Sequence, residues 1–453
     1  MKKKMICLLA AVLFGVLFLC SCGGEDYAFT ASASNWYWYN GYVYSMNTNG
    51  ILTYRKATET EESPLCFDPL CEHRGYNGTE CPAFAIGARD AMTVTRNREG
   101  EICIFYTDMI EHLEDIKSGI WPFKYRLCCI NTQTGQKTVI LDEQPEEVVK
   151  FYLFGNNIYL HMRGRTKNEE GKTVYQSQYW KMSADGSNLT KLPVPEFNVN
   201  RIVAIAEMKG RTVIYWLDIY DNNTLYVSPE DFSERTKVAE GLATYEKFVV
   251  GDYLYYAIED PEVIPEMQVK APVDGDGPTP GVTYTVYPEA KNAAYYRLSI
   301  TDPKAVPELM YDGVSSVYTV DARPMWANGD KIYVIPYDPV FFEVLDAYAV
   351  VGHVNTETQP NKIPLQYEYI NARSGMKIIE IDLVTGERRE IHTPGFNPET
   401  IMGGDDDTLV VRGSVVDIDR IRERIRDLTA ENGSFPLKES YMFWEIREID
   451  LNP

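Results

Sequence analysis

Short apolar segments recur along this chain, and each is introduced by a turn that carries Gly, Asn or Asp. Asn328-Gly329-Asp330, for example, leads into the apolar segment Lys331–Ile335. Its neighbour Lys377–Asp382 turns through Val384–Glu387 into Arg389–Ile391. Because glycine readily takes the positive φ of tight hairpin turns, and aromatic and β-branched residues suit a pleated surface, each copy predicts a hairpin. The turns of the seven copies are Asn40-Gly41, Glu99-Gly100, Gly155-Asn156-Asn157, Lys209-Gly210, Gly251-Asp252, Gly329-Asp330 and Gly404-Asp405.

Each hairpin has further strand-like segments on both sides. Segments such as Trp36–Tyr39 and Phe151–Phe154 precede the turn, and segments such as Leu52–Arg55 and Tyr179–Ser183 follow the second strand. A fourth segment often comes next, as in Thr138–Leu141. Repeated units of four antiparallel strands are typical of propeller blades, since each unit buries its apolar face only against its neighbours. We therefore predict an all-β fold, a seven-bladed β-propeller with four-stranded antiparallel blades.

The segment Lys181-Met182-Ser183-Ala184-Asp185-Gly186-Ser187 and the Tyr-rich second strands resemble the blades of propeller domains in bacterial surface lipoproteins. Those domains are related to the TolB-type and low-density-lipoprotein-receptor-type propellers, and lipoproteins of this kind occur in gut clostridia. The resemblance covers nearly the whole chain after its leader. It implies the propeller fold, and it carries no activity with it.

The first residues have the features of a bacterial lipoprotein signal peptide. Lys2, Lys3 and Lys4 are basic, and the apolar run Met5–Leu19 is short for a membrane span. The run ends in Leu19-Cys20-Ser21-Cys22, which matches the lipobox: an aliphatic residue, two small residues and the cysteine that receives diacylglycerol. We predict a signal peptide over residues 1–21 and lipid on Cys22, the alternative being an ordinary cleaved secretory signal. The protein is then expected at the outer face of the cell membrane or in the periplasm.

The remaining boundaries follow from the repeats. Residues 22–35 are predicted to be a lipidated tether, and residues 36–453 the propeller. The last repeat ends with the strand Phe443–Asp450 and has no fourth strand after it. We therefore expect the segment Glu25–Ala33 to close the ring by pairing with that last blade, because an open strand edge is a liability.

Long insertions lie between the second and third predicted strands of five repeats, so we expect them all on one face of the propeller. Loops on a rigid scaffold commonly carry binding sites. The last insertion has Ile418, Ile421, Ile425 and Leu428 at three- and four-residue spacing and predicts a helix at about residues 414–430. The five insertions are Thr107–Lys124, His161–Gln178, Glu259–Ala294, Pro336–Gly375 and Gly413–Tyr441.

The loop 65–92 holds the clearest candidate chemistry, with Cys66, Cys71, His73 and Cys81 close together in the sequence. Three thiols and an imidazole match the four tetrahedral ligands of Zn²⁺, and Asp68-Pro69 supplies a turn that lets two of the thiols converge. A disulfide such as Cys66–Cys81, or three free thiols, are the alternatives, because the compartment is expected to be oxidising. The string Cys-x-Asp-Pro-Leu-Cys-x-His followed by Cys-Pro resembles one in lipoproteins of gut clostridia, which implies a shared structural device and no reaction.

Cys103, Cys128 and Cys129 lie in predicted strands of the second blade and are expected to be buried free thiols. Zinc is the cofactor that the loop 65–92 predicts. We expect no nucleotide and no organic cofactor.

Aromatic residues of the insertions are the candidate ligand-binding residues, since they can stack on sugar rings or anchor a partner protein. They are Tyr337, Phe341, Phe342, Tyr367, Tyr369 and Trp121.

Charge and missing motifs restrict the function. A formal net charge of −22 argues against nucleic acid, whose phosphates are bound by Lys and Arg. The sequence has no Gly-x-Ser-x-Gly elbow of a propeller-type peptidase. We predict a monomeric, lipid-anchored binding or scaffold module, without catalytic residues, for a glycan, a peptide or an envelope protein. The alternative is an extracytoplasmic hydrolase that acts on glycan or peptide at the propeller face.

Overall fold

The computed structural model of the 453-residue chain describes residues 27–31, 36–47, 49–57, 59, 61–73, 81–85, 91–97, 99–112, 123–167, 170–193, 201–259, 267–270, 283–286, 291–315, 325–336, 340–345, 368–372, 374–432 and 442–452. They fall into two compact units. The first takes in the described residues up to 56 and those within 61–197 and 230–233, and the second those within 57–60, 198–229 and 234–453.

The first unit holds three antiparallel sheets, in each of which successive strands are hydrogen-bonded to one another. The first sheet consists of β2 (Trp36–Tyr39), β3 (Tyr42–Met46), β4 (Leu52–Lys56) and β5 (Ser63–Pro64). The second consists of β6 (Met92–Arg96), β7 (Ile102–Glu111), β8 (Phe123–Asn131) and β9 (Lys137–Gln144). The third consists of β1 (Tyr27–Ala31), β10 (Glu147–Gly155), β11 (Asn157–Lys167), β12 (Thr173–Ser183) and β13 (Thr190–Lys191).

The second unit holds four main sheets. The fourth sheet consists of β14 (Arg201–Met208), β15 (Arg211–Asp218), β16 (Thr224–Pro229) and β17 (Thr236–Ala239), and the fifth of β18 (Leu242–Val250), β19 (Tyr253–Glu259), β22 (Lys291–Ser299) and β23 (Glu308–Ser315). The sixth sheet consists of β24 (Met325–Asn328), β25 (Lys331–Val334), β28 (Lys377–Asp382) and β29 (Arg388–His392). The seventh consists of β30 (Phe396–Gly404), β31 (Thr408–Val415) and β32 (Trp444–Asp450). The insertions add the hairpins β20 (Met267–Lys270)–β21 (Thr283–Val286) and β26 (Val340–Leu345)–β27 (Glu368–Ala372), and the helix α3 (Ile418–Asn432).

Seven successive antiparallel meanders confirm the predicted fold class, an all-β seven-bladed β-propeller. The predicted turns form as their residue types require. In the turn between β2 and β3, Asn40 has φ 51° and Gly41 has φ 80°, both in the left-handed region that Asn and Gly tolerate best. Each long insertion joins the second strand of its meander to the third, as the sequence indicated; in the third sheet, where β1 is added before β10, these strands are β11 and β12.

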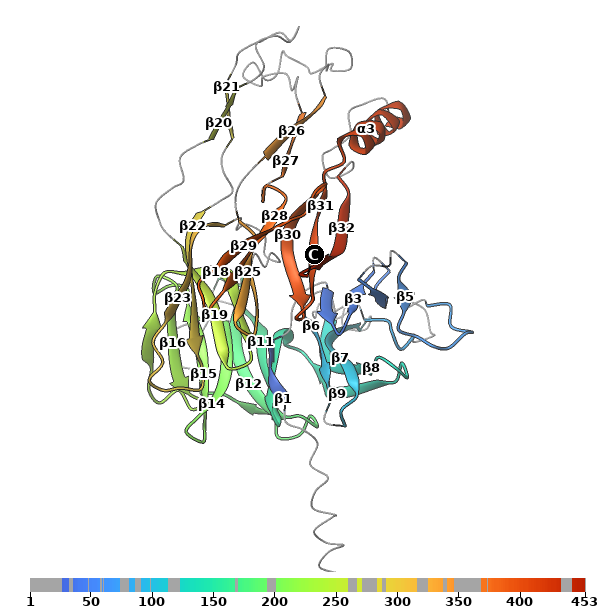
Figure 1. Ribbon diagram of the computed structural model, residues 1–453. Helices are drawn as coiled ribbons and strands as arrows, with labels where there is room; N and C mark the ends of the chain where they lie inside the picture. The colour runs from blue at the N-terminus through green and yellow to red at the C-terminus, as the bar shows by residue number, and fades with distance from the viewer. Residues whose placement is uncertain are drawn as a thin grey trace, which may run out of the picture. The chain divides into compact units, whose positions relative to one another are not determined.

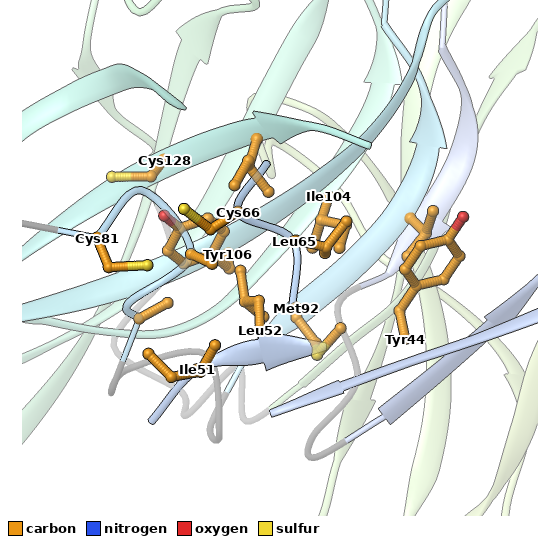
Figure 2. Close-up of a cluster of buried hydrophobic side chains, with 14 residues drawn as sticks. Tyr44, Ile51, Leu52, Leu65, Cys66, Cys81, Met92, Ile104, Tyr106 and Cys128 are labelled. Atoms are coloured by element: carbon orange, nitrogen blue, oxygen red, sulfur yellow. The ribbon is translucent and has the colours of Figure 1, made fainter. Parts of the chain in front are cut away.

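Neighbouring sheets share apolar cores in the first unit. Tyr44 and Leu52 of the first sheet pack with Ile104 and Tyr106 of the second in one buried cluster, which Figure 2 shows in close-up. A second buried cluster joins residues of the second and third sheets, among them Phe105 and Phe151. Each sheet therefore buries its apolar face against the next one, as repeated units must.

The helical insertion forms slightly later in the sequence than predicted. Asp417 caps α3, because its Oδ1 atom accepts a hydrogen bond from the Arg420 amide at 3.0 Å. Ile421, Ile425 and Leu428 are buried on one face and pack against neighbours that include Phe443. In Figure 1 α3 (red) adjoins the ends of β31 and β32.

One of the predicted insertions is largely strand, and another is strand at both ends. β7 continues to Glu111 and β8 begins at Phe123, so the two ends of Thr107–Lys124 belong to strands. His161–Gln178 pairs without a break as far as Lys167 opposite Thr173. The hydrogen-bonded ladder satisfies backbone groups that an irregular loop would leave to water, so these strands project well past the core.

The predicted ring closure by Glu25–Ala33 is wrong. β1 pairs with the first strand of the third sheet, β10, with Tyr27 opposite Gly155 and Ala31 opposite Tyr152. Tyr27 is buried, and its ring meets Phe105 edge-on at 5.9 Å between centroids. The edge of β10 offers the same unpaired backbone groups as any other strand edge. The burial of the Tyr27 ring stabilises the pairing of β1 with this edge. Within the described part of the chain, β32 pairs with β31 alone.

The leader and Cys22 lie outside the described residues, so their predicted roles stay predictions. No helix in the part of the chain that the structure describes is both long and apolar enough to cross a membrane.

Candidate metal centre

The loop that carries the four candidate ligands begins and ends on the same edge of β4. On one side, the Leu65 amide donates to the Leu52 carbonyl at 2.9 Å, just after β5 pairs with β4. On the other side, the Leu52 amide donates to the Ala83 carbonyl at 2.8 Å, and Ile51 forms a bridge with Phe84. The outer edge of the first sheet is therefore built from two separate pieces of chain, and the candidate ligands lie between them.

A tight turn brings the first two cysteines together. The Asp68 side chain accepts from the Leu70 amide at 2.9 Å, and the Asp68 carbonyl accepts from the Cys71 amide at 3.1 Å. This Asx turn after Cys66 reverses the chain, as the Asp-Pro pair predicted.

Gly135, in the turn between β8 and β9, packs against the start of the same loop. Its φ is 68°, and a Cβ atom there would lie 3.0 Å from Cδ2 of Phe67 and 3.2 Å from the Leu65 carbonyl oxygen. Only glycine allows this close approach at that backbone angle. The loop is thereby held against the second sheet on the side where Cys66 lies.

Cys66, Cys71, His73 and Cys81 converge as predicted. Their ligand atoms all lie within 4.8 Å of one another. His73 has φ 52°, its Nδ1 atom lies 3.7 Å from the Cys81 sulfur, and its amide donates to the Cys71 sulfur at 3.4 Å. Ligands at the bond lengths of tetrahedral zinc are separated by about 3.5–3.8 Å, so a small contraction of this set would enclose the ion.

The four candidate ligands lie at the boundary between the buried core and the surface. Cys66 and Cys81 are buried, whereas Cys71 and His73 are partly exposed. Figure 2 shows Cys66 and Cys81 at one end of the buried cluster, next to the ring of Tyr106. Two ligands are thus fixed by core packing, and the other two lie on the turn that covers them.

Burial also affects the protonation of Cys81. Removal from water, together with the neighbouring Cys71 and Cys66 thiols, raises the pKa of Cys81 to about 12. Without a cation the thiol therefore keeps its proton at neutral pH. A bound metal ion reverses this preference, because a cation stabilises the thiolate directly.

The cysteines that the structure describes form no disulfide, and this group includes Cys66, Cys71 and Cys81. A disulfide would also give no role to His73, which the fold brings to the same point. The cluster could hold a metal, and this arrangement favours a metal over the alternative Cys66–Cys81 disulfide. Cys103, Cys128 and Cys129 are free thiols, as predicted; the first two are buried and Cys129 is partly exposed.

The predicted ligand-binding aromatics belong to the insertions, and only some of them lie in described strands. Trp121, Tyr337 and Tyr367 lie outside the described residues. Phe341 and Phe342 belong to β26, and Tyr369 belongs to β27, so their backbones share one hairpin, with Phe342 opposite Ile370.

A concave site that the sequence did not reveal lies at the end of the third sheet where β12 turns into β13. Its volume is about 400 Å³. Lys181 of β12 and Glu230, in the turn after β16, meet in this pocket with 2.8 Å between ammonium and carboxylate. No short motif could have signalled it, because the two residues are far apart in sequence and no local spacing links them.

Comparisons with known proteins give only distant structural likenesses. No family model matches the chain, and no curated protein matches it. A puromycin-hydrolysing peptidase from Mycobacterium tuberculosis is similar in structure at 11% identity and a TM-score of 0.44, over 84% of this chain and 50% of that one. The polysaccharide lyase Uly1 is similar at 10% identity and a TM-score of 0.37, over 93% of this chain and 90% of that one. The chain spans half the length of the peptidase, and neither likeness says what this chain does.

Proposed function

We propose that the protein is a lipid-anchored β-propeller held outside the cytoplasm, where it serves as a binding or scaffold module, and that its Cys₃His cluster holds one structural Zn²⁺. The observation that carries the metal assignment is the convergence of four ligand atoms within 4.8 Å at the edge of a buried core. The anchor is supported by the lipobox that ends at Cys22.

Zinc is the metal that best fits these ligands. Three thiolates and one imidazole form a soft donor set, which selects Zn²⁺ over the hard cations Mg²⁺ and Ca²⁺. Four protein ligands complete a tetrahedron and leave no position for a water molecule or a substrate, which is the arrangement of structural sites. The zinc therefore has a structural role, and Cys66, Cys71, His73 and Cys81 are not catalytic residues.

The structural role follows from the backbone. The pieces that end at Leu65 and begin at Ala83 both hydrogen-bond to Leu52, and the zinc ligands connect them. A metal bound between these pieces would hold both on the edge of β4. The centre thus completes the first blade in place of one continuous outer strand.

The binding role rests on the scaffold and its charge. The insertions project a paired ribbon, two hairpins and a capped helix from a rigid set of sheets. The strong negative charge disfavours nucleic acid as a partner. The membrane is contacted through the lipid, and the ligand is a glycan, a peptide or an envelope protein.

Metal analysis of the purified full chain tests the proposal. We expect about one equivalent of zinc, the content of a single four-ligand site. Replacement by Co²⁺ should give the visible spectrum of tetrahedral thiolate coordination. Metal-free protein whose three thiols are all alkylated without reductant would contradict the metal assignment. Turnover of glycans or peptides by the zinc-loaded protein would favour the hydrolase alternative.

A further inference from the structure

The pocket at the junction of β12 and β13 (the β12 pocket) has the size of a small-molecule site. Its volume of about 400 Å³ falls in the range of about 300–1,000 Å³ that is common for ligand sites. All of its lining residues belong to the first unit. It lies at the end of β11 and β12 opposite to the hairpin tip near residue 170.

A partly buried ion pair forms one wall. The Lys181 ammonium lies 2.8 Å from the Glu230 carboxylate, and the Tyr159 hydroxyl also donates to that carboxylate. The side chains of Lys181 and Glu230 are 25% and 28% exposed, so most of each is removed from water. Such a pair adds little stability, because desolvation offsets most of the attraction. The position of this ion pair in a pocket is therefore better explained by a role in binding a ligand than by a role in stability.

The pair keeps unused hydrogen-bonding capacity. An ammonium group has three donors, and an ionised carboxylate has about four acceptor positions. Lys181 and Tyr159 occupy two of the acceptor positions on Glu230. A ligand in the pocket can therefore accept from Lys181 and donate to Glu230 at the same time.

Fixed turns hold the polar rim. The Ser183 amide donates to the Ser187 carbonyl at 2.8 Å, and the Asn188 side-chain amide donates to the Ser183 hydroxyl at 3.2 Å. Next to Glu230 in the chain, Asp231 accepts from the amide and the hydroxyl of Ser233. A rim that is already ordered loses little entropy when a ligand binds.

The charges of the lining cancel. Lys181 and Lys191 balance Glu230 and Asp231, whereas the whole chain has a net charge of −22. A charged ligand would gain no net attraction here. A neutral ligand with hydroxyl groups, each of which both donates and accepts, matches the pair directly. The apolar side chains of Met182 and Leu192 also line the pocket and can contact the C–H face of a sugar ring.

We propose that the β12 pocket binds a neutral sugar unit of an extracellular or envelope glycan. This inference rests on the proposed function as a binding module and names its ligand class and its site. Lys181 and Glu230 bind the hydroxyl groups, and the apolar lining orients the ring.

Calorimetric titration of the full chain in detergent tests the inference. The probes are two neutral tetrasaccharides, cellotetraose and the tetramer of N-acetylglucosamine, together with the anionic tetragalacturonate and the neutral peptide tetraglycine. We expect a neutral tetrasaccharide to bind. Glu230→Gln and Lys181→Met should each weaken its binding about tenfold, which corresponds to about 1.4 kcal/mol.

A third variant keeps the test sharp if the ion-pair variants are unstable. Thr190 lines the pocket with an exposed side chain on β13, so Thr190→Trp should obstruct the site and leave the ion pair in place. Lys172→Met and Glu170→Gln are the matched controls, since this pair has the same charges and is fully outside the pocket, at 76% and 68% exposure. Both controls should bind like the unaltered protein.

The outcomes separate this inference from the proposed function. Sugar binding that survives all three pocket variants would overturn the inference and leave the binding module intact. Binding of tetragalacturonate or tetraglycine alone would overturn the ligand class, as would no binding of either neutral sugar at millimolar concentration. Failure of the metal and membrane assignments would be seen in metal analysis and fractionation, and these do not depend on the titration.

Discussion

His73 Nδ1 lies 3.7 Å from Cys81 Sγ, although the two residues come from different pieces of the loop 65–92. The backbone of His73 takes the left-handed conformation, which is uncommon for a residue with a side chain, and this directs the imidazole toward the thiols. A local cost of this kind is expected where a bound ion stabilises the arrangement.

Substitution of single ligands should separate metal binding from folding. Cys81→Ser should reduce the metal content from about one equivalent to nearly none, and His73→Ala should leave three thiolates that release zinc more readily to a chelator. Each kcal/mol of lost zinc stabilisation should lower the melting temperature by about 1 °C, because the entropy of unfolding scales with the 453 residues of the chain. Hydrogen exchange should quicken in residues 65–73 and 81–85 and stay slow in β6–β8.

Two controls identify effects that do not come from the metal. His112→Ala removes a partly exposed imidazole that pairs with Glu143, and Cys128→Ala removes a buried thiol that is not one of the four candidate ligands. Both variants should keep a full equivalent of zinc. Metal loss from either, or full metal content in Cys81→Ser, would contradict the assignment of the ligands.

Acid should release the metal. In the absence of zinc, burial and the neighbouring thiols raise the pKa of Cys81 to about 12, so its sulfur binds a proton strongly and zinc must displace that proton. Lower pH favours the protonated, metal-free form, because protons compete with zinc for the thiolates. Metal content measured after equilibration at stepwise lower pH tests this. Zinc that is retained unchanged to pH 4 would contradict a site made of these ligands.

Lipid on Cys22 predicts where the protein is found. Cys22→Ala removes the acceptor of the diacylglycerol, so the variant should move from the membrane fraction to the soluble fraction or remain as unprocessed precursor with its leader. Cys20→Ala is the matched control, because Cys20 lies within the same apolar leader and is not the modified residue. It should stay in the membrane fraction and carry lipid by mass spectrometry. Processed, unlipidated protein that remains membrane-bound would show that another feature anchors it.

The sequence predicts best where structure is local. Turns such as Asn40-Gly41 and the alternating strands beside them define the blades, because residue type alone decides which backbone angles are accessible. The metal ligands were found for the same reason, since Cys66, Cys71, His73 and Cys81 are close enough in sequence to converge around one turn.

Features that depend on distant partners could not be predicted in this way. Lys181 lies in β12 and Glu230 in the turn after β16, so only the fold brings them to one pocket. The partner of β1 was wrongly predicted because an apolar strand can add to any open edge, and no residue pattern states which edge is open. The packing of Tyr27 against Phe105 decides it.

The position of β1 gives a prediction that separates the two pairings. Tyr27 is 8% exposed and packs in the cluster that contains Phe105 and Phe151. Tyr27→Ala should therefore cost about 2–4 kcal/mol of stability, as expected for the loss of a large buried ring. Tyr220→Ala is the control, because Tyr220 is 74% exposed and its loss should change stability by less than about 0.5 kcal/mol. Hydrogen exchange decides the pairing: faster exchange in β10 with β32 unchanged supports the observed sheet, whereas faster exchange in β32 would restore the ring closure.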